Sequence, residues 1–143
     1  MRRAVLAIAL VASACGGDET LTSEEYAARL NAACREFAER ELRIGDPQTA
    51  ADLVEDGPEV LQAFEETILE AADSTEAPDE IAGEAALLRR LAHDQRDVLA
   101  GLVDAARDRD VPRLSRLAAQ NRSLNQEASS TARRIGADAC AGS

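Results

Sequence analysis

The chain has few of the residues that build β-sheets. Aromatic residues make up only 2% of its 143 residues. Its apolar residues are therefore mostly Ala, Leu, Val and Ile, and the abundance of Ala and Leu favours helices over strands. The length allows one domain with a modest core. Composition by itself thus predicts an all-α fold.

Positive charge is also scarce. The 16 basic residues, all arginine, stand against 27 acidic residues and leave a formal net charge of −11 at pH 7. Such a chain is repelled by the phosphates of nucleic acids and by anionic lipid head groups. We therefore expect no nucleic-acid partner, and any membrane association must come from something other than basic side chains.

Metal ligands and catalytic groups are equally few. His93 is the only histidine, and the three cysteines form no Cys-x-x-Cys motif, so we expect neither a metal nor another cofactor. His93 falls on a solvated helix face one turn before Asp97, with which it could pair, and this position favours a surface role over a catalytic one. The carboxylates fall on solvated faces or at helix starts, and acid–base work would require burial or repulsion to shift their pKa. We therefore expect no enzymatic activity.

The N-terminus resembles a secretory signal. Arg2-Arg3 precedes an apolar run over 4–11, and Ala12-Ser13-Ala14-Cys15 follows it. This order of positive, apolar and small residues is typical of a signal peptide, and the run is far shorter than the roughly 20 residues that span a bilayer. Small residues ending in Cys resemble the lipobox of bacterial lipoproteins, which implies a lipid on Cys15. Ala12 departs from that motif, which usually has Leu there.

These features predict three segments, namely a lipoprotein signal peptide over 1–14, a lipidated Cys15 with a flexible tether over 15–21, and a helical domain over 22–143. Each buried methylene of an acyl chain contributes about 0.8 kcal/mol, so more than one chain gives a durable anchor. The cleaved chain would carry 27 acids against 14 arginines. We expect a lipid-anchored, extracytoplasmic protein at the bacterial cell membrane. An ordinary signal peptide cut after Ala14 is the alternative.

Hydrophobic periodicity predicts four amphipathic helices, over 22–43, 58–72, 79–108 and 112–135, with a short helix over 49–55. Thr22 and Glu25 form a capping box at the start of the first. The residues expected to face inward from this helix are Tyr26, Leu30, Ala33, Phe37 and Leu42. Helices of this length with short connections predict an up-and-down four-helix bundle.

Two cysteines remain once Cys15 is lipidated. Outside the cytoplasm, where disulfides persist, Cys34 and Cys140 permit one pairing. That bond would close a loop of about 105 residues, for which the chain-entropy model gives roughly 4.7 kcal/mol as an upper value. A reactive thiol pair is the alternative.

Polar residues interrupt two of the apolar seams. Arg109 falls in the turn expected between the helices over 79–108 and 112–135. Gln95 lies 14 residues before Arg109, and Asn121 lies 12 residues after it. In an antiparallel hairpin the two would lie at nearly the same height. One interpretation is a buried polar pair that fixes the register of the helices. The other is that Gln95, Asn121 and Asn125 line a small-molecule pocket.

Several short motifs resemble those of small, uncharacterised lipoproteins from actinobacteria and their relatives. They are Ala12-Ser13-Ala14-Cys15, Glu25-Tyr26, Asn31-Ala32-Ala33-Cys34, Asp46-Pro47-Gln48-Thr49, Ala77-Pro78-Asp79 and the closing stretch Ile135-Gly136-Ala137-Asp138-Ala139-Cys140. The resemblance implies a helical, disulfide-closed extracytoplasmic domain. It implies no activity and no functional residue beyond the lipidated cysteine.

Two functions agree with these features. The first is a non-enzymatic, membrane-anchored helical domain that binds an envelope protein. The second is an extracytoplasmic small-molecule binder with a pocket in the bundle core near Gln95 and Asn121. An enzyme would need an acid with a strongly raised pKa inside the bundle. The sequence does not give the oligomeric state.

Overall fold

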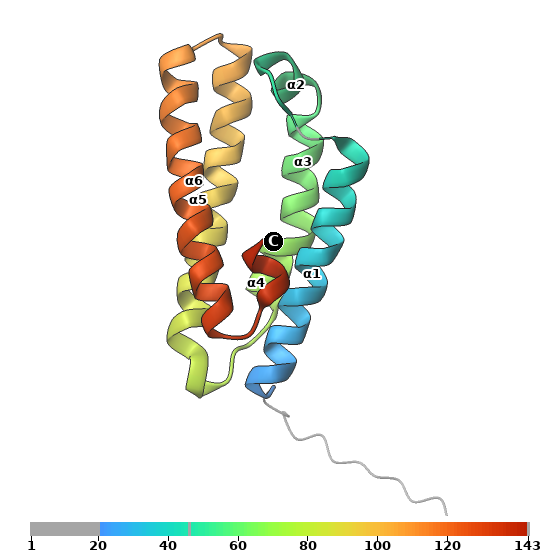
Figure 1. Ribbon diagram of the computed structural model, residues 1–143, viewed down its shortest axis with the longest axis vertical. Helices are drawn as coiled ribbons and strands as arrows, with labels where there is room; N and C mark the ends of the chain where they lie inside the picture. The colour runs from blue at the N-terminus through green and yellow to red at the C-terminus, as the bar shows by residue number, and fades with distance from the viewer. Residues whose placement is uncertain (1–20, 46, 143) are drawn as a thin grey trace, which may run out of the picture.

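The computed structural model describes residues 21–45 and 47–142, and these residues form helices and connecting turns, with no strand among them. The expected signal peptide, the lipidated Cys15 and nearly all of the tether lie outside the described residues. The helical elements, shown in Figure 1, are α1 (Ser23–Ile44), α2 (Ala50–Glu55), α3 (Gly57–Phe64), the π-helix η1 (Glu65–Leu69), α4 (Glu70–Ser74), the 3₁₀-helix η2 (Asp79–Ile81), α5 (Ala82–Arg107), α6 (Val111–Arg134) and the 3₁₀-helix η3 (Asp138–Ala141).

Side-chain caps fix the starts of three helices. Thr22 accepts a hydrogen bond from the N–H of Glu25, whose carboxylate accepts one from the N–H of Thr22, so the expected capping box opens α1. Thr49 and Asp52 form a second capping box at α2. Asp110 accepts from the N–H of Arg113 at the start of α6. Local hydrogen bonding therefore sets these boundaries close to where the sequence places them.

The expected single helix over 58–72 is wrong in one respect, because a π-helical turn divides it. The N–H of Glu70 donates to the carbonyl of Glu65, five residues earlier. Within this turn the buried Thr67 hydroxyl donates to the carbonyl of Ala63 at 2.7 Å, a bond that competes with the ordinary helical ladder. Hydrophobic periodicity continues through the segment, which is why it gives no sign of the wider turn.

The helices pack as two neighbouring groups, as Figure 1 shows. α5 and α6 form a hairpin, while α1 lies against α3, η1 and α4. α2, α3, η1 and α4 contact α5, and the C-terminal η3 joins the two groups because it contacts both α1 and α6. The two clusters of the core hold Tyr26, Leu30, Ala85, Ala132, Ile135 and Ala137 in one and Phe64, Ala72 and Ala92 in the other.

The end of α1 departs from expectation. Leu42, expected to face inward, is 85% exposed. The short α2 packs on α3 and α5, so it does not cover the last turn of α1. The periodicity of α1 is correct, but the helix extends beyond the core that its apolar face covers.

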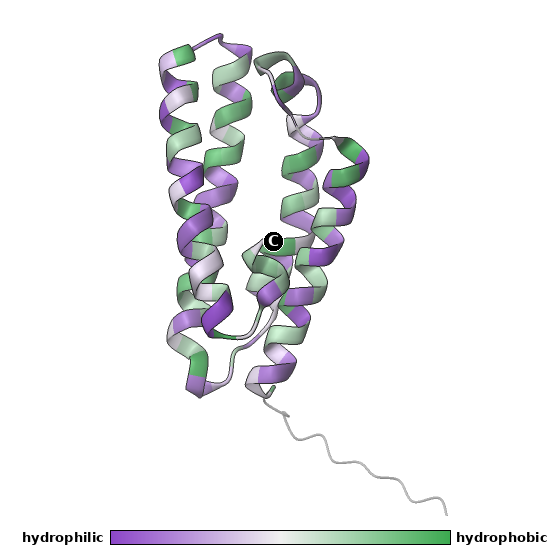
Figure 2. Ribbon diagram, in the orientation of Figure 1, coloured by the Kyte–Doolittle hydropathy of each residue, from purple (hydrophilic) through white to green (hydrophobic). Residues whose placement is uncertain are grey.

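No helix in the part of the chain that the structure describes is long and apolar enough to cross a bilayer. Hydrophilic residues are spread along all the long helices in Figure 2.

Candidate functional site

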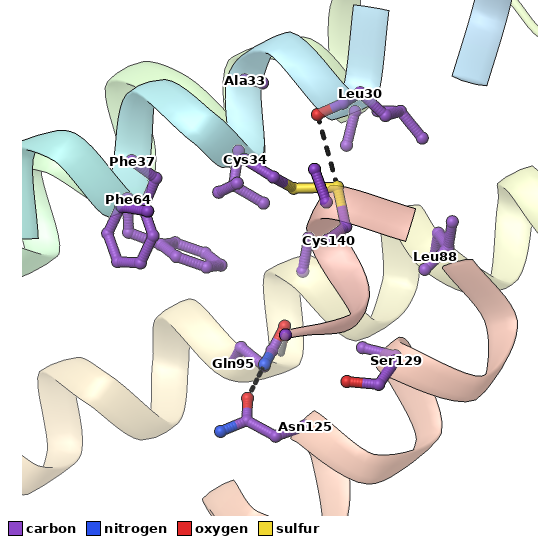
Figure 3. A pocket seen from close by; sticks show the side chains of 17 residues that line it. Leu30, Ala33, Cys34, Phe37, Phe64, Leu88, Gln95, Asn125, Ser129 and Cys140 are labelled. Carbon is purple, nitrogen blue, oxygen red and sulfur yellow. Dashed lines mark hydrogen bonds between the residues drawn. A yellow bond between two sulfur atoms is a disulfide. The ribbon is translucent and has the colours of Figure 1, made fainter. Parts of the chain in front are cut away.

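A partly enclosed cavity of about 390 Å³ lies among α1, the α3–η1–α4 segment, α5, α6 and η3 (Figure 3). Its lining residues are mostly apolar and come from all of these elements. They are Leu30, Ala33, Cys34, Phe37, Ala38, Phe64, Ile68, Ala72, Leu88, Ala92, Gln95, Asn125, Ala128, Ser129, Ala139, Cys140 and Gly142. The alanines leave this space because none of them reaches far from its helix.

Two aromatic rings form part of the apolar wall. Phe37 from α1 and Phe64 from the end of α3 meet edge to face, with ring centroids 5.6 Å apart and planes at 87°. Ile68, one of the π-helical residues, lines the same cavity. Two of the few aromatic residues of the chain are therefore used here, and π-helical turns recur at functional sites.

The polar part of the wall comes from α5 and α6. The Nε2 atom of Gln95 donates a hydrogen bond to Oδ1 of Asn125, and Ser129 lies one turn further along α6 (Figure 3). Gln95 is half-buried and Asn125 is exposed. This pair is therefore not the fully buried one that a pure register role would require.

Asn121 was expected to face Gln95, and this expectation is wrong. Asn121 is half-buried on α6, but the partner of Gln95 is Asn125, and Asn121 is not among the residues that line the cavity. Helical side chains lean toward the N-terminus of their own helix. Gln95 therefore leans away from the turn between α5 and α6, and it meets the residue further from that turn.

The third part of the wall is the C-terminal segment, held against α1. The sulfur atoms of Cys34 and Cys140 lie 1.95 Å apart, the distance of a disulfide, and both residues line the cavity. The Sγ atom of Cys140 also lies 3.3 Å from the carbonyl oxygen of Leu30 (Figure 3). A disulfide sulfur has no hydrogen to donate, so this is a packing contact.

Sequence reasoning missed Asn31, which also holds this segment. Its Nδ2 donates to the carbonyl of Gly136 at 3.2 Å, and its Oδ1 accepts from the N–H of Ala139 at 2.7 Å. Asn31 lies one helical turn before Cys34 on α1. A polar residue at that spacing from a cysteine was the signal that could have found it.

Charged side chains pair outside the cavity, along the contacts of the α3–η1–α4 segment with α1 and α5. Arg40 bonds Glu36 and Glu66 at 2.7 and 2.6 Å, and Arg96 bonds Glu65 at 3.0 Å. Hydrogen bonds from Gln62 and Arg40 hold the pKa of Glu66 below its ordinary value. Among the described residues, the carboxyl groups with a resolved shift are Glu25, Asp52 and Glu66, and each has a pKa lowered by the hydrogen bonds that it accepts.

His93 is exposed on α5, but its partner differs from the one expected. Its Nε2 lies 3.0 Å from Oδ1 of Asp73 on α4. Asp97, the expected partner, instead bonds Arg96 at 2.6 Å. Within the described ranges no group of three or more His, Cys, Asp or Glu side chains is arranged to hold a metal.

Comparison of the chain with protein-family models, with curated proteins and with solved structures finds no match.

Proposed function

We propose that this chain is a non-enzymatic, extracytoplasmic lipoprotein that is anchored through Cys15 and binds a small molecule in the cavity of an up-and-down four-helix bundle. The first 18 residues and the resemblance to small actinobacterial lipoproteins support the proposed anchor and export. The cysteine pair at disulfide distance agrees with an oxidising compartment.

The observation that carries the binding role is the cavity itself. Ligand sites have volumes of about 300–1,000 Å³, mostly apolar walls and a few polar groups that orient the ligand. The cavity of about 390 Å³ has such walls, with Phe37, Phe64 and Ile68 on the apolar side and Gln95 and Asn125 on the polar side. It is the feature of the described residues that most resembles a binding site.

A thermal-shift screen of small metabolites with the purified domain tests this role. A true ligand at 100 times its Kd stabilises the fold by about 2.7 kcal/mol. Ala128→Phe places a ring in the cavity from α6 and should abolish the shift. Ala119→Phe adds the same ring at an exposed position of the same helix and should preserve it. A stabilising compound whose effect survives Ala128→Phe binds elsewhere and counts against the proposal.

Metabolic labelling with a fatty-acid analogue tests the anchor. The wild type should incorporate label, and Cys15→Ser should not. Label on both forms, or on neither, overturns the anchor. Release of an unlipidated protein cut after Ala14 would identify the ordinary signal peptide instead.

A protein-binding role is the second candidate, and exposed apolar side chains favour it. Leu42 and Val111 are 85% and 65% exposed, and Val54 is 39% exposed. They belong to the last turn of α1, to the start of α6 and to α2, which all lie at the end of the molecule away from the start of α1 (Figure 1). An anchored chain would present this end to an envelope protein. A crosslinker placed at position 42 in living cells should then capture one defined partner, while one at the exposed Arg35 should not.

A further inference from the structure

Charged side chains are absent from the described part of the cavity wall. None of the described residues that line it has an ionisable side chain, because its two cysteines lie at disulfide distance. Arg40 and Arg96, which do not line the cavity, bond carboxylates. A charged group placed against these side chains finds no partner of opposite charge among them. We therefore expect the site to favour an uncharged ligand over an ion of either sign.

The polar groups of the wall leave both a donor and an acceptor unused. The bond from Gln95 to Asn125 uses one amide hydrogen and one amide oxygen. The oxygen of Gln95 and the NH₂ group of Asn125 remain, and the same inventory remains if the two amides exchange their orientations. A hydroxyl or a primary amide, which both donates and accepts, matches such a pair.

The size of the cavity limits the apolar part of a ligand. A water molecule occupies about 30 Å³ in the liquid and a methylene group is of similar size, so about 390 Å³ holds roughly a dozen non-hydrogen atoms. The aromatic pair of Phe37 and Phe64 supplies apolar surface for such a chain.

We infer that the ligand is an uncharged, medium-length, single-chain amphiphile, with its hydroxyl or amide group at Gln95 and Asn125 and its hydrocarbon against Phe37 and Phe64. This inference rests on the proposed binding role of the cavity and adds the chemical class of the ligand.

Isothermal titration calorimetry with 1-octanol, octanoate and octylammonium at pH 7 tests the inference, since the three probes share one hydrocarbon chain and differ in head-group charge. 1-Octanol should bind at least about tenfold more tightly than either ion, with the negative heat-capacity change of apolar burial. Gln95→Leu should weaken 1-octanol by about fivefold, the effect of one hydrogen bond. Ala128→Phe should abolish its binding, and Ala119→Phe should not change it.

The outcomes separate this inference from the proposed function. Equal or tighter binding of either ion, lost in Ala128→Phe, overturns the ligand class and leaves the binding role intact. A failure of all three probes, with a charged or non-amphiphilic metabolite from the screen still bound in the cavity, does the same. Failure of the probes together with an empty screen removes both proposals.

Discussion

The Oδ1 atom of Asn31 accepts a hydrogen bond from the backbone N–H of Ala139 at 2.7 Å, across 108 residues of sequence. One turn further along α1, Cys34 lies at disulfide distance from Cys140. These two attachments hold η3 against α1, and the cavity wall on this side consists of the residues that they fix.

Asn31→Ala should lower the free energy of unfolding by about 1–3 kcal/mol, because it removes two hydrogen bonds and leaves backbone groups of Gly136 and Ala139 without them. Urea denaturation of the oxidised protein measures the change. Arg35→Ala, at an exposed position of the same helix, is the control and should change stability by less than about 0.5 kcal/mol. Equal effects of the two variants would show that Asn31 does not hold the C-terminal segment.

Cys34→Ser should destabilise the domain far more than Cys15→Ser. The sequence separation of Cys34 and Cys140 is 106, and the chain-entropy model gives up to about 4.7 kcal/mol for a loop of this size. Urea denaturation with and without a reductant measures this, and the reductant should have no further effect on Cys34→Ser. Two free thiols in the intact mass of the native protein would contradict the pairing.

Gly57→Ala should destabilise the fold by about 1–3 kcal/mol through overpacking. A Cβ at this position would lie 2.6 Å from Cγ2 of the buried Val103. At Gly83, also helical, a Cβ meets nothing within 4 Å, so Gly83→Ala should instead stabilise by about 0.4–1 kcal/mol. Thermal melting of both variants gives the comparison. If Gly57→Ala is destabilising to the same degree in a Val103→Ala background, the clash is not the cause.

Glu66 should contribute to the loss of stability in acid. Its pKa in the folded state is lowered, by hydrogen bonds from Gln62 and then Arg40. Because the pKa of Glu66 is lower in the folded than in the unfolded state, its ionised carboxylate stabilises the fold. This stabilisation is complete above the unfolded pKa, ordinarily near 4.5, and it is lost as the pH falls through the folded pKa. The stability difference between wild type and Glu66→Gln should therefore shrink below about pH 4.5.

Melting temperatures from pH 7 to pH 2.5 measure this difference. Glu39→Gln, at an exposed position of α1, serves as the control. If the melting temperatures of Glu66→Gln and the wild type differ by the same amount across this range, the charge of Glu66 has no favoured partner in the folded state.

Local sequence patterns determined most of the secondary structure. Thr22, Thr49 and Asp110 cap the helices that they precede, and helical periodicity located the four long segments, because a cap and an amphipathic stripe depend only on residues within one or two turns. The count of cysteines likewise left one pairing for Cys34 and Cys140 once Cys15 was set aside.

The tertiary structure alone decided where these segments meet. The exposure of Leu42 and the pairing of Gln95 with Asn125 both depend on the relative height and rotation of different helices. Apolar residues at spacings of three and four identify the buried side of a helix, but they do not give the position of that helix along a neighbouring helix. The cavity arises from such positions, because small residues on five separate elements face one space and leave it unfilled.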